Sequence, residues 1–368
     1  MKIVRMALLS LNLSFGLSFG LFFGLGISLN GHAQVGELRN YLNDSDFNDN
    51  YWKNSTPAAE GLDTKRLDEA LEFIRETKME LHSFTIIKNG KLVFDYYGTE
   101  EKDSKTIQRT PAHTHTLYST TKTLTSALIG IAIAENTLSG VNQKVLPFFA
   151  NDSIENITDE KRNITIENLL TMQSGLQYKE GELDALFNSN RASATEFLTR
   201  PLIHKPGSHW NYSSGDSQIL SEIVRRSTGS TPQNYAYKKL FKPLGIRKPQ
   251  WSADKSGTNY GGWGLFLTPR DLARVGYLYL QNGRWEGQQL IPQTWIADST
   301  QAKVKSAWSG HYAYHCWAPT IGGFATQGYM GQNMYVFPDR DLIVVFTANL
   351  DGNTADSTLS DLVRDYIL

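Results

Sequence analysis

The chain has 368 residues with 36 Lys and Arg against 37 Asp and Glu, a formal net charge of −1, and a single cysteine, Cys316. The balanced charge, with no basic patch and no long run of one sign, argues against a nucleic-acid partner and against extended disorder. A chain of this length buries a large core, so we expect it to be stable without disulfide bonds.

The first 33 residues have the features of an export signal. Lys2 and Arg5 form a basic start, residues 6–29 are apolar with Gly and Ser interspersed, and residues 31–33 place small side chains where a signal peptidase cleaves. The apolar stretch is longer than usual, so an uncleaved membrane anchor is the alternative. We expect an exported protein, periplasmic or secreted, without stable membrane insertion once the signal is removed.

A polar lead-in segment over residues 34–60 precedes the single domain that we expect over residues 61–368. Apolar residues from Leu67 to Ile74 recur at helical spacing and predict a helix that begins at Asp63 or Thr64. The segments 83–87 and 91–97 are rich in β-branched and aromatic residues. They flank Lys88-Asn89-Gly90 and therefore predict a β-hairpin.

The middle of the chain, about residues 131–245, predicts a mostly helical subdomain, and a further helix begins at Thr268. A second strand pair, 333–337 and 342–348, surrounds a turn-forming segment and precedes a C-terminal helix. A hairpin near each end of the chain and a helical middle predict an α+β fold. Its antiparallel sheet would be built from both chain ends, with the helical subdomain inserted between them.

A serine and a lysine, Ser119 and Lys122, begin the apolar helix-like segment 117–130. Their spacing places both side chains on one face of a helix. A desolvated lysine can take the proton of a serine hydroxyl, and the helix N-terminus offers N–H groups where an oxyanion would form. An N-cap serine beside a solvated lysine is the alternative, and the same spacing at 252–255 lies in a segment that we interpret as loop.

Tyr212 lies just before a predicted helix, in the segment 210–216. A tyrosine close to Ser119 could relay protons between the nucleophile, Lys122 and a leaving group, and an ordinary turn is the alternative. His113 and His115 form an isolated pair without a carboxylate or cysteine at ligand spacing. We therefore predict neither a metal site nor a cofactor.

Five motifs occur in a characteristic order: Ser119-x-x-Lys122, Leu169–Leu176, Pro206-Gly207, Tyr212-Ser213-Ser214 and Pro243-Leu244-Gly245. Together they resemble the serine beta-lactamase and penicillin-binding-protein superfamily, of which the Ser-x-x-Lys motif is typical. From about residue 61 onward the chain looks most like the class C branch, which includes esterases, D-aminopeptidases, D,D-peptidases and 6-aminohexanoate-dimer hydrolases. The resemblance implies a beta-lactamase/transpeptidase-like α/β sandwich.

By position, the resemblance implies Ser119 as the acylated nucleophile and Lys122 as its proton acceptor or electrostatic partner. Tyr212 would be the general base and acid that relays the proton. Ser214 stands where the commonest family pattern has asparagine. A serine at this position also resembles the aminohexanoate-dimer hydrolase group. Its hydroxyl can still hydrogen-bond Lys122 or substrate.

The family's third motif aligns best with Thr326-Gln327-Gly328. Gly328 would permit close backbone approach, and the Tyr329 N–H would be the second oxyanion donor beside that of Ser119. Most relatives have Lys or His where Thr326 stands, and losing the ion pair to a substrate carboxylate costs about two decades of binding or rate. We expect inefficient turnover of beta-lactams and D-Ala-D-Ala peptides, unless a cation such as His315 compensates.

Trp263 and Trp317 are expected at the pocket walls, where apolar surface would suit an acyl chain or a linear amide. Ordinary core or rim positions are the alternative. We predict an exported esterase or amidase that cleaves a small-molecule or short peptide-like substrate through a Ser119 acyl-enzyme. A beta-lactamase or D,D-peptidase, and a non-catalytic binding or sensor domain, are the alternatives, and the oligomeric state is left open.

Overall fold

The computed structural model describes residues 51–102, 104–180, 192–308 and 310–368. The expected export signal and most of the lead-in segment lie outside these residues. The end of the lead-in segment is structured: it contains strand β1 (Lys53–Asn54) and the 3₁₀ turn η2 (Ala58–Glu60), and it buries Trp52 in the core. Within the described ranges, no helix is long and apolar enough to span a membrane.

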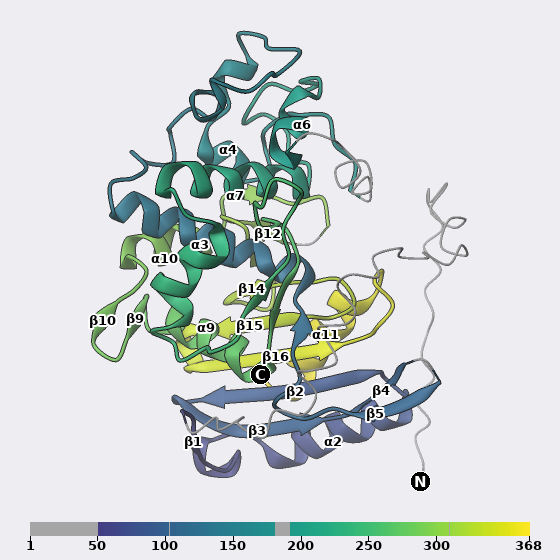
Figure 1. The fold of residues 1–368 in the computed structure, drawn as a ribbon. Helices are drawn as coiled ribbons and strands as arrows, with labels where there is room; N and C mark the ends of the chain where they lie inside the picture. Colours follow the sequence, from purple (N-terminus) through teal and green to yellow (C-terminus); the bar gives the residue numbers. More distant parts are fainter. Residues whose placement is uncertain (1–50, 103, 181–191, 309) are drawn as a thin grey trace, which may run out of the picture. The chain divides into compact units, whose positions relative to one another are not determined.

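Both predicted hairpins are confirmed. Strands β2 (Leu81–Lys88) and β3 (Lys91–Tyr97) are joined by Asn89 and Gly90, whose φ angles of 52° and 70° match the tight turn that such residues favour. Strands β15 (Asn333–Phe337) and β16 (Leu342–Ala348) have the predicted bounds, and β16 pairs with β2 along almost its full length. The two ends of the chain therefore meet in one sheet, seen in purple and yellow in Figure 1.

This sheet has nine strands in the order β1-β3-β2-β16-β15-β14-β13-β12-β11. All of its pairs are antiparallel except β1 with β3, which is a small departure from the predicted antiparallel sheet. The far edge is made of short strands: β11 (Val304–Lys305), β12 (His311–Tyr312), β13 (Trp317–Ala318) and β14 (Phe324–Thr326).

Three smaller sheets complete the strand inventory of the described residues: β6 (His115–Thr116) with β8 (Leu265–Leu267) and β7 (Gln250–Trp251), β4 (Thr99–Lys102) with β5 (Lys105–Gln108), and β9 (Arg284–Trp285) with β10 (Gln288–Gln289). The second Ser-x-x-Lys segment, 252–255, follows β7 and is loop as predicted.

Side chains alternate between the two faces of the large sheet. On β16, Leu342, Val344 and Phe346 enter one hydrophobic cluster, whereas Ile343 and Val345 enter another. Helices α2 (Thr64–Glu76) and α11 (Ala355–Tyr366) cover the first face, and α9 (Pro269–Leu280) covers the second. The result is the predicted α/β sandwich.

The predicted helix starts are capped by the expected kind of residue. The Asp63 carboxylate accepts from the backbone N–H groups of Lys65 and Arg66, and Thr268 caps α9 through the N–H of Asp271. In the described part of the predicted helical middle, the regular elements are helices and turns joined by long loops: η4 (Leu146–Phe149), η5 (Lys161–Asn163), α4 (Ile166–Leu170), α6 (Ser193–Thr199), α7 (Ser214–Thr228), α8 (Pro232–Ala236) and the π turn η6 (Tyr237–Phe241). The remaining elements are η7 (Pro338–Arg340) and α10 (Gln293–Thr300).

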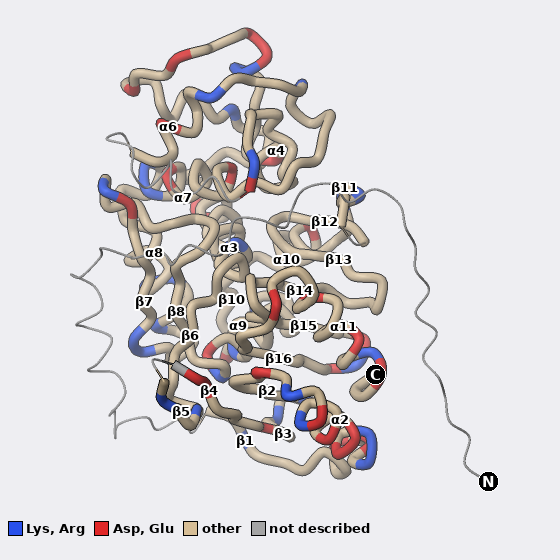
Figure 2. The backbone as a smooth tube through the Cα atoms, turned by 90° about the vertical axis from the view of Figure 1, so that its right-hand side faces the viewer, with Lys and Arg blue, Asp and Glu red and all other residues tan. Residues whose placement is uncertain are grey.

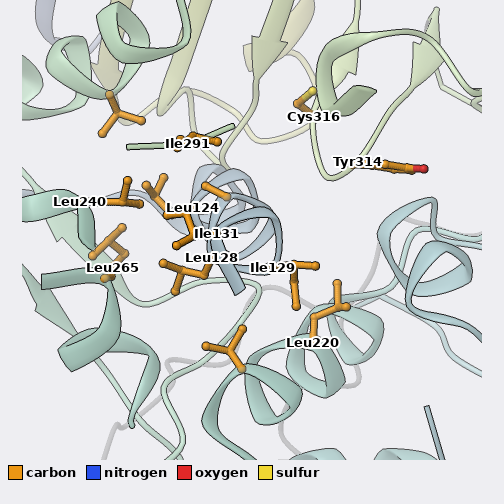
Figure 3. Close-up of a cluster of buried hydrophobic side chains, with 14 of the residues drawn as sticks. Leu124, Leu128, Ile129, Ile131, Leu220, Leu240, Leu265, Ile291, Tyr314 and Cys316 are labelled. Carbon is orange, nitrogen blue, oxygen red and sulfur yellow. The ribbon is translucent and has the colours of Figure 1, made fainter. Parts of the chain in front are cut away.

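Helix α3 (Thr121–Ala134) is the centre of the larger hydrophobic cluster. Figure 3 shows its Leu124, Leu128 and Ile131 directed toward Leu240 and Leu265, and Ile129 toward Leu220 of α7. A helix that is apolar on most sides must be enclosed by protein. Figure 2 shows that acidic and basic segments are interspersed along the chain around this interior.

The contact between α3 and α10 depends on a glycine. A Cβ atom at Gly130 would lie 2.3 Å from Cγ of Trp295. We expect Gly130→Ala to lower the free energy of unfolding by about 1–3 kcal/mol, because this overpacking outweighs the better helix propensity of alanine. Urea unfolding measures this loss of unfolding free energy for Gly130→Ala in the wild-type and in the Trp295→Ala backgrounds. An equal loss in both backgrounds would contradict a clash with the Trp295 ring.

Candidate active site

Ser119 lies in the 3₁₀ turn η3 (Tyr118–Thr120), which leads directly into α3. The preceding residue, Tyr118, has a left-handed φ of 43°, an uncommon conformation for a bulky side chain. Ser119 itself is half-buried, so the residue keeps part of its surface in contact with solvent. The Lys122 Nζ lies 3.0 Å from the Ser119 Oγ, as the spacing of the two residues requires.

Lys122 is 1% exposed, yet its amine has three polar neighbours. Besides Ser119, Nζ lies 3.0 Å from the Ser214 Oγ and 3.1 Å from the Gly262 carbonyl oxygen. A Cβ atom at Gly262 would lie only 3.2 Å from this Nζ, so a side chain at that position would crowd the amine. Complete burial lowers the pKa of Lys122 to about 8, although the attraction of the Glu180 carboxylate opposes this shift.

Glu180 belongs to this network and was missed by the sequence analysis. The Ser214 hydroxyl donates to Glu180 Oε1 at 2.6 Å, and the Ser214 backbone N–H donates to Oε2 at 3.2 Å. Ser214 begins α7, so the carboxylate also lies at a helix N-terminus, where negative charge is stabilised. Glu180 follows the Leu169–Leu176 motif in a loop, and no spacing rule in the sequence connects it with Ser214 or Lys122.

Tyr212 lies beside both Ser119 and Lys122. Its ring centroid is 4.7 Å from the Lys122 Nζ, and its hydroxyl is hydrogen-bonded to Ser119. Burial raises the pKa of the Tyr212 phenol far above its ordinary value, and the nearby carboxylates of Glu180 and Asp356 act in the same direction. The tyrosine is therefore a protonated phenol at neutral pH.

The third predicted motif lies at the end of β14, next to the serine. A Cβ atom at Gly328 would lie 2.4 Å from the Leu117 carbonyl oxygen, so only glycine permits this approach to the chain leading to Ser119. Thr326 is 1% exposed, and its hydroxyl forms a 3.1 Å hydrogen bond with Thr120. Thr326 thus supports the turn that carries Ser119 and does not extend into solvent.

The residues that flank Gly328 differ in exposure. Gln327 is half-buried and hydrogen-bonded to Tyr335. Tyr329 is half exposed, and its ring packs edge-on against Tyr118 at a centroid distance of 5.6 Å. The Tyr329 backbone is therefore held beside the turn that carries Ser119.

The two predicted wall residues have different surroundings. Trp317 is buried and stacks on Tyr212, with ring centroids 6.0 Å apart and 20° between the ring planes. Trp263 is half-buried and stacks on Tyr260 at 4.8 Å, directly after the Gly262 carbonyl that Lys122 contacts. Both rings lie next to residues of the Ser119–Lys122 network.

His315 does not supply the cation that Thr326 lacks. Its imidazole donates from Nδ1 to the Leu170 carbonyl at 3.0 Å, and its Nε2 lies 2.9 Å from the Ser217 Oγ. Complete burial lowers its pKa to about 3, so the ring is neutral. No group of three or more metal-ligating side chains occurs in the described part of the chain, and His113 accepts a hydrogen bond from the Thr110 N–H.

The sandwich of a two-ended sheet and helices, with Ser119 and Lys122 at the start of its buried helix, has the architecture of beta-lactamase and transpeptidase-like proteins. A model of the beta-lactamase family matches residues 75–367, and the chain belongs to this family. The resemblance and the fold class predicted from the sequence are thereby confirmed, as is the chain's membership of a family that includes serine hydrolases.

Individual relatives are distant. The chain is 23% identical over 313 residues to the 6-aminohexanoate-dimer hydrolase of Paenarthrobacter ureafaciens, which covers 76% of this chain and 75% of that protein. It is 28% identical over 211 residues to an Escherichia coli protein provisionally assigned as a D-alanyl-D-alanine carboxypeptidase, covering 52% of this chain and 48% of the relative. A penicillin-binding protein from Bacillus halodurans has the same fold, with a TM-score of 0.64 and 17% identity, over 80% of this chain and 98% of that one.

Asp216, two residues after Ser214, is a completely buried carboxyl group at the start of α7. Its Oδ1 accepts from the Ser174 hydroxyl at 2.7 Å, and burial raises its pKa to about 7. A carboxyl whose folded pKa is raised stabilises the protein below its unfolded value of 3.8, and this stability is lost as the pH rises toward 7.

We therefore expect Asp216→Asn to be more stable than the wild type at pH 8, by about 2–4 kcal/mol, with the difference vanishing near pH 4. Denaturant unfolding across this pH range measures the difference. A gain of equal size at both pH values would show that ionisation of Asp216 is not its cause.

Proposed function

We propose that this protein is a serine hydrolase that cleaves an uncharged ester or amide through an acyl-enzyme on Ser119. The observation that carries the proposal is the hydrogen-bond network around Lys122, in which a buried amine contacts the serine hydroxyl at 3.0 Å. A non-catalytic binding domain does not need a lysine buried beside an accessible serine, because burial of an amine is costly unless the amine is used.

The direction of each hydrogen bond identifies the proton acceptor. The Gly262 carbonyl can only accept, and the Ser214 hydroxyl donates to Glu180, so both take an N–H of Lys122. A neutral amine has two N–H groups and one lone pair. The lone pair then faces the Ser119 hydroxyl, which is the arrangement needed to remove its proton.

For Tyr212 we propose the acid part of the general base and acid role that the resemblance implies. Because its phenol stays protonated, it is suited to donate a proton to the leaving atom, while the proton held by Lys122 restores the phenol. The N–H groups of Ser119 and Tyr329 would stabilise the oxyanion. Water then attacks the acyl-enzyme while Lys122 accepts its proton, and Lys122 returns that proton to the Ser119 oxygen as the acid product leaves.

The charges around the site favour a substrate without a carboxylate. Thr326 is neutral and inward-facing, and His315 is uncharged. The carboxylates of Glu180 and Asp356 lie close enough to Tyr212 to raise its pKa. We therefore rank esters and linear amides above beta-lactams and D-Ala-D-Ala peptides as substrates. We also propose that the protein is exported, on the strength of the N-terminal sequence features described above.

We expect a fluorophosphonate to add one adduct to the wild-type protein and none to Ser119→Ala, because only an activated serine reacts. Intact-mass analysis measures this. A parallel panel of p-nitrophenyl esters, nitrocefin and an aminohexanoate dimer ranks the substrates. Labelling of Ser119→Ala to the same extent, or no adduct together with no turnover, would refute the hydrolase proposal and leave a binding domain.

The kcat/KM of the wild type should rise with pH through a midpoint near 8, where Lys122 loses its proton. Glu180 raises the pKa of Lys122, so Glu180→Gln should move this midpoint down by roughly half a pH unit or more. The amide of glutamine still accepts from Ser214, so the plateau rate should change little.

Two variants separate charge from geometry in this measurement. Glu180→Ala also removes the acceptor of Ser214, and its plateau should fall by about tenfold or more. Glu72→Gln removes the same charge from the exposed face of α2 and should leave the midpoint in place. An unchanged midpoint in Glu180→Gln would show that Glu180 does not act on Lys122.

A further inference from the structure

Trp308 is an exposed aromatic side chain that packs against Tyr212. Its exposed fraction is 62%, the highest of the large hydrophobic side chains in the described ranges. Its ring centroid lies 4.9 Å from that of Tyr212, and it stacks on Trp317 at 5.7 Å with 25° between the planes. Because this exposed ring packs on a proposed catalytic residue, it is a candidate contact surface for a substrate.

Trp308 is supported by neighbours that fix its position. Trp210 contacts it edge-on at 5.6 Å, and Tyr312 packs edge-on against Trp317 at 4.8 Å. We call Trp210, Tyr212, Trp308, Tyr312 and Trp317 the aromatic cluster. All members except Trp308 are buried or half-buried. The cluster is therefore a rigid apolar wall with one open ring, and a preformed wall costs little conformational entropy when it binds a flat group.

The position of Tyr212 shows which part of a substrate meets this wall. In the proposed reaction, its phenol is hydrogen-bonded to Ser119 and gives a proton to the leaving atom. The group bonded to the leaving atom must then lie next to the Tyr212 ring and the rings packed on it.

The charges near the cluster specify the leaving group further. Lys122 lies 4.7 Å from the Tyr212 centroid, but its amine is occupied by Ser119, Ser214 and Gly262. The carboxylates of Glu180 and Asp356 act on the same tyrosine and would repel an anion.

We propose that the aromatic cluster is a leaving-group subsite, and that the preferred substrates are esters or amides whose alcohol or amine part carries a neutral aromatic group. This inference rests on the proposed hydrolase function. It assigns Trp308 as the residue that determines leaving-group specificity.

Benzyl acetate and ethyl acetate test the subsite, because they share one acyl group and have alcohols of similar acidity. We expect the wild type to have a kcat/KM about tenfold or more higher for the benzyl ester, as contact with an aromatic wall would give. Trp308→Ala should remove most of this ratio by lowering only the benzyl rate, and Trp308→Phe should retain most of it. Tyr237→Ala removes an exposed ring from η6 and should leave the ratio unchanged.

A wild-type ratio of benzyl to ethyl ester kcat/KM near one, or a ratio that Trp308→Ala does not change, would overturn the subsite. In either case, turnover of the esters would still support the hydrolase proposal. If the wild type hydrolyses neither ester, the fluorophosphonate adduct decides the hydrolase proposal, and titration calorimetry of 2-naphthol with Ser119→Ala decides the subsite separately. Binding of 2-naphthol to Ser119→Ala that is lost in the double variant Ser119→Ala/Trp308→Ala supports the subsite. Absence of binding to Ser119→Ala overturns the subsite.

Discussion

The amine of Lys122 can be buried at the start of α3 because Ser119, Ser214 and the Gly262 carbonyl each form a hydrogen bond with it. Removing an ammonium group from water costs several kcal/mol, which favours the neutral amine and lowers its pKa. Three chain segments that are distant in sequence must be held in place to make these bonds. The packing of α3 against α7 serves that requirement, and the absence of a side chain at Gly262 leaves room for the amine.

The parts of the fold that were predictable are those specified by local patterns. The hairpin turn at Asn89-Gly90 and the strand pair 333–337 and 342–348 combine short strand-forming segments with turn-forming residues, and both were found where expected. Strands β11 to β14 are two or three residues long and exist only through pairing with neighbours. Trp52 was assigned to a lead-in segment because a single buried aromatic residue has no periodicity.

In the candidate site, too, some residues are specified by local sequence patterns and others only by tertiary contacts. Ser119, Lys122, Tyr212 and Ser214 carry motif spacings, and the structure brings them together. Glu180 and Trp308 carry no spacing signal, because their roles depend on tertiary contacts with Ser214 and Tyr212. The burial of Thr326 and His315 was likewise outside what a linear pattern can specify, since either side chain could have faced solvent.

The pairing of β2 with β16 makes completion of the large sheet depend on a strand more than 240 positions further along the chain. Until β16 is synthesised, β2 has an unpaired edge, and Thr120 lacks its partner Thr326, 206 positions further along. Contacts of such sequence separation close slowly. A nascent chain therefore cannot complete the large sheet before β15 and β16 are synthesised. The turn that carries Ser119 is supported through the Thr120–Thr326 contact, so the candidate site is assembled only after the strands that follow the helical middle are in place.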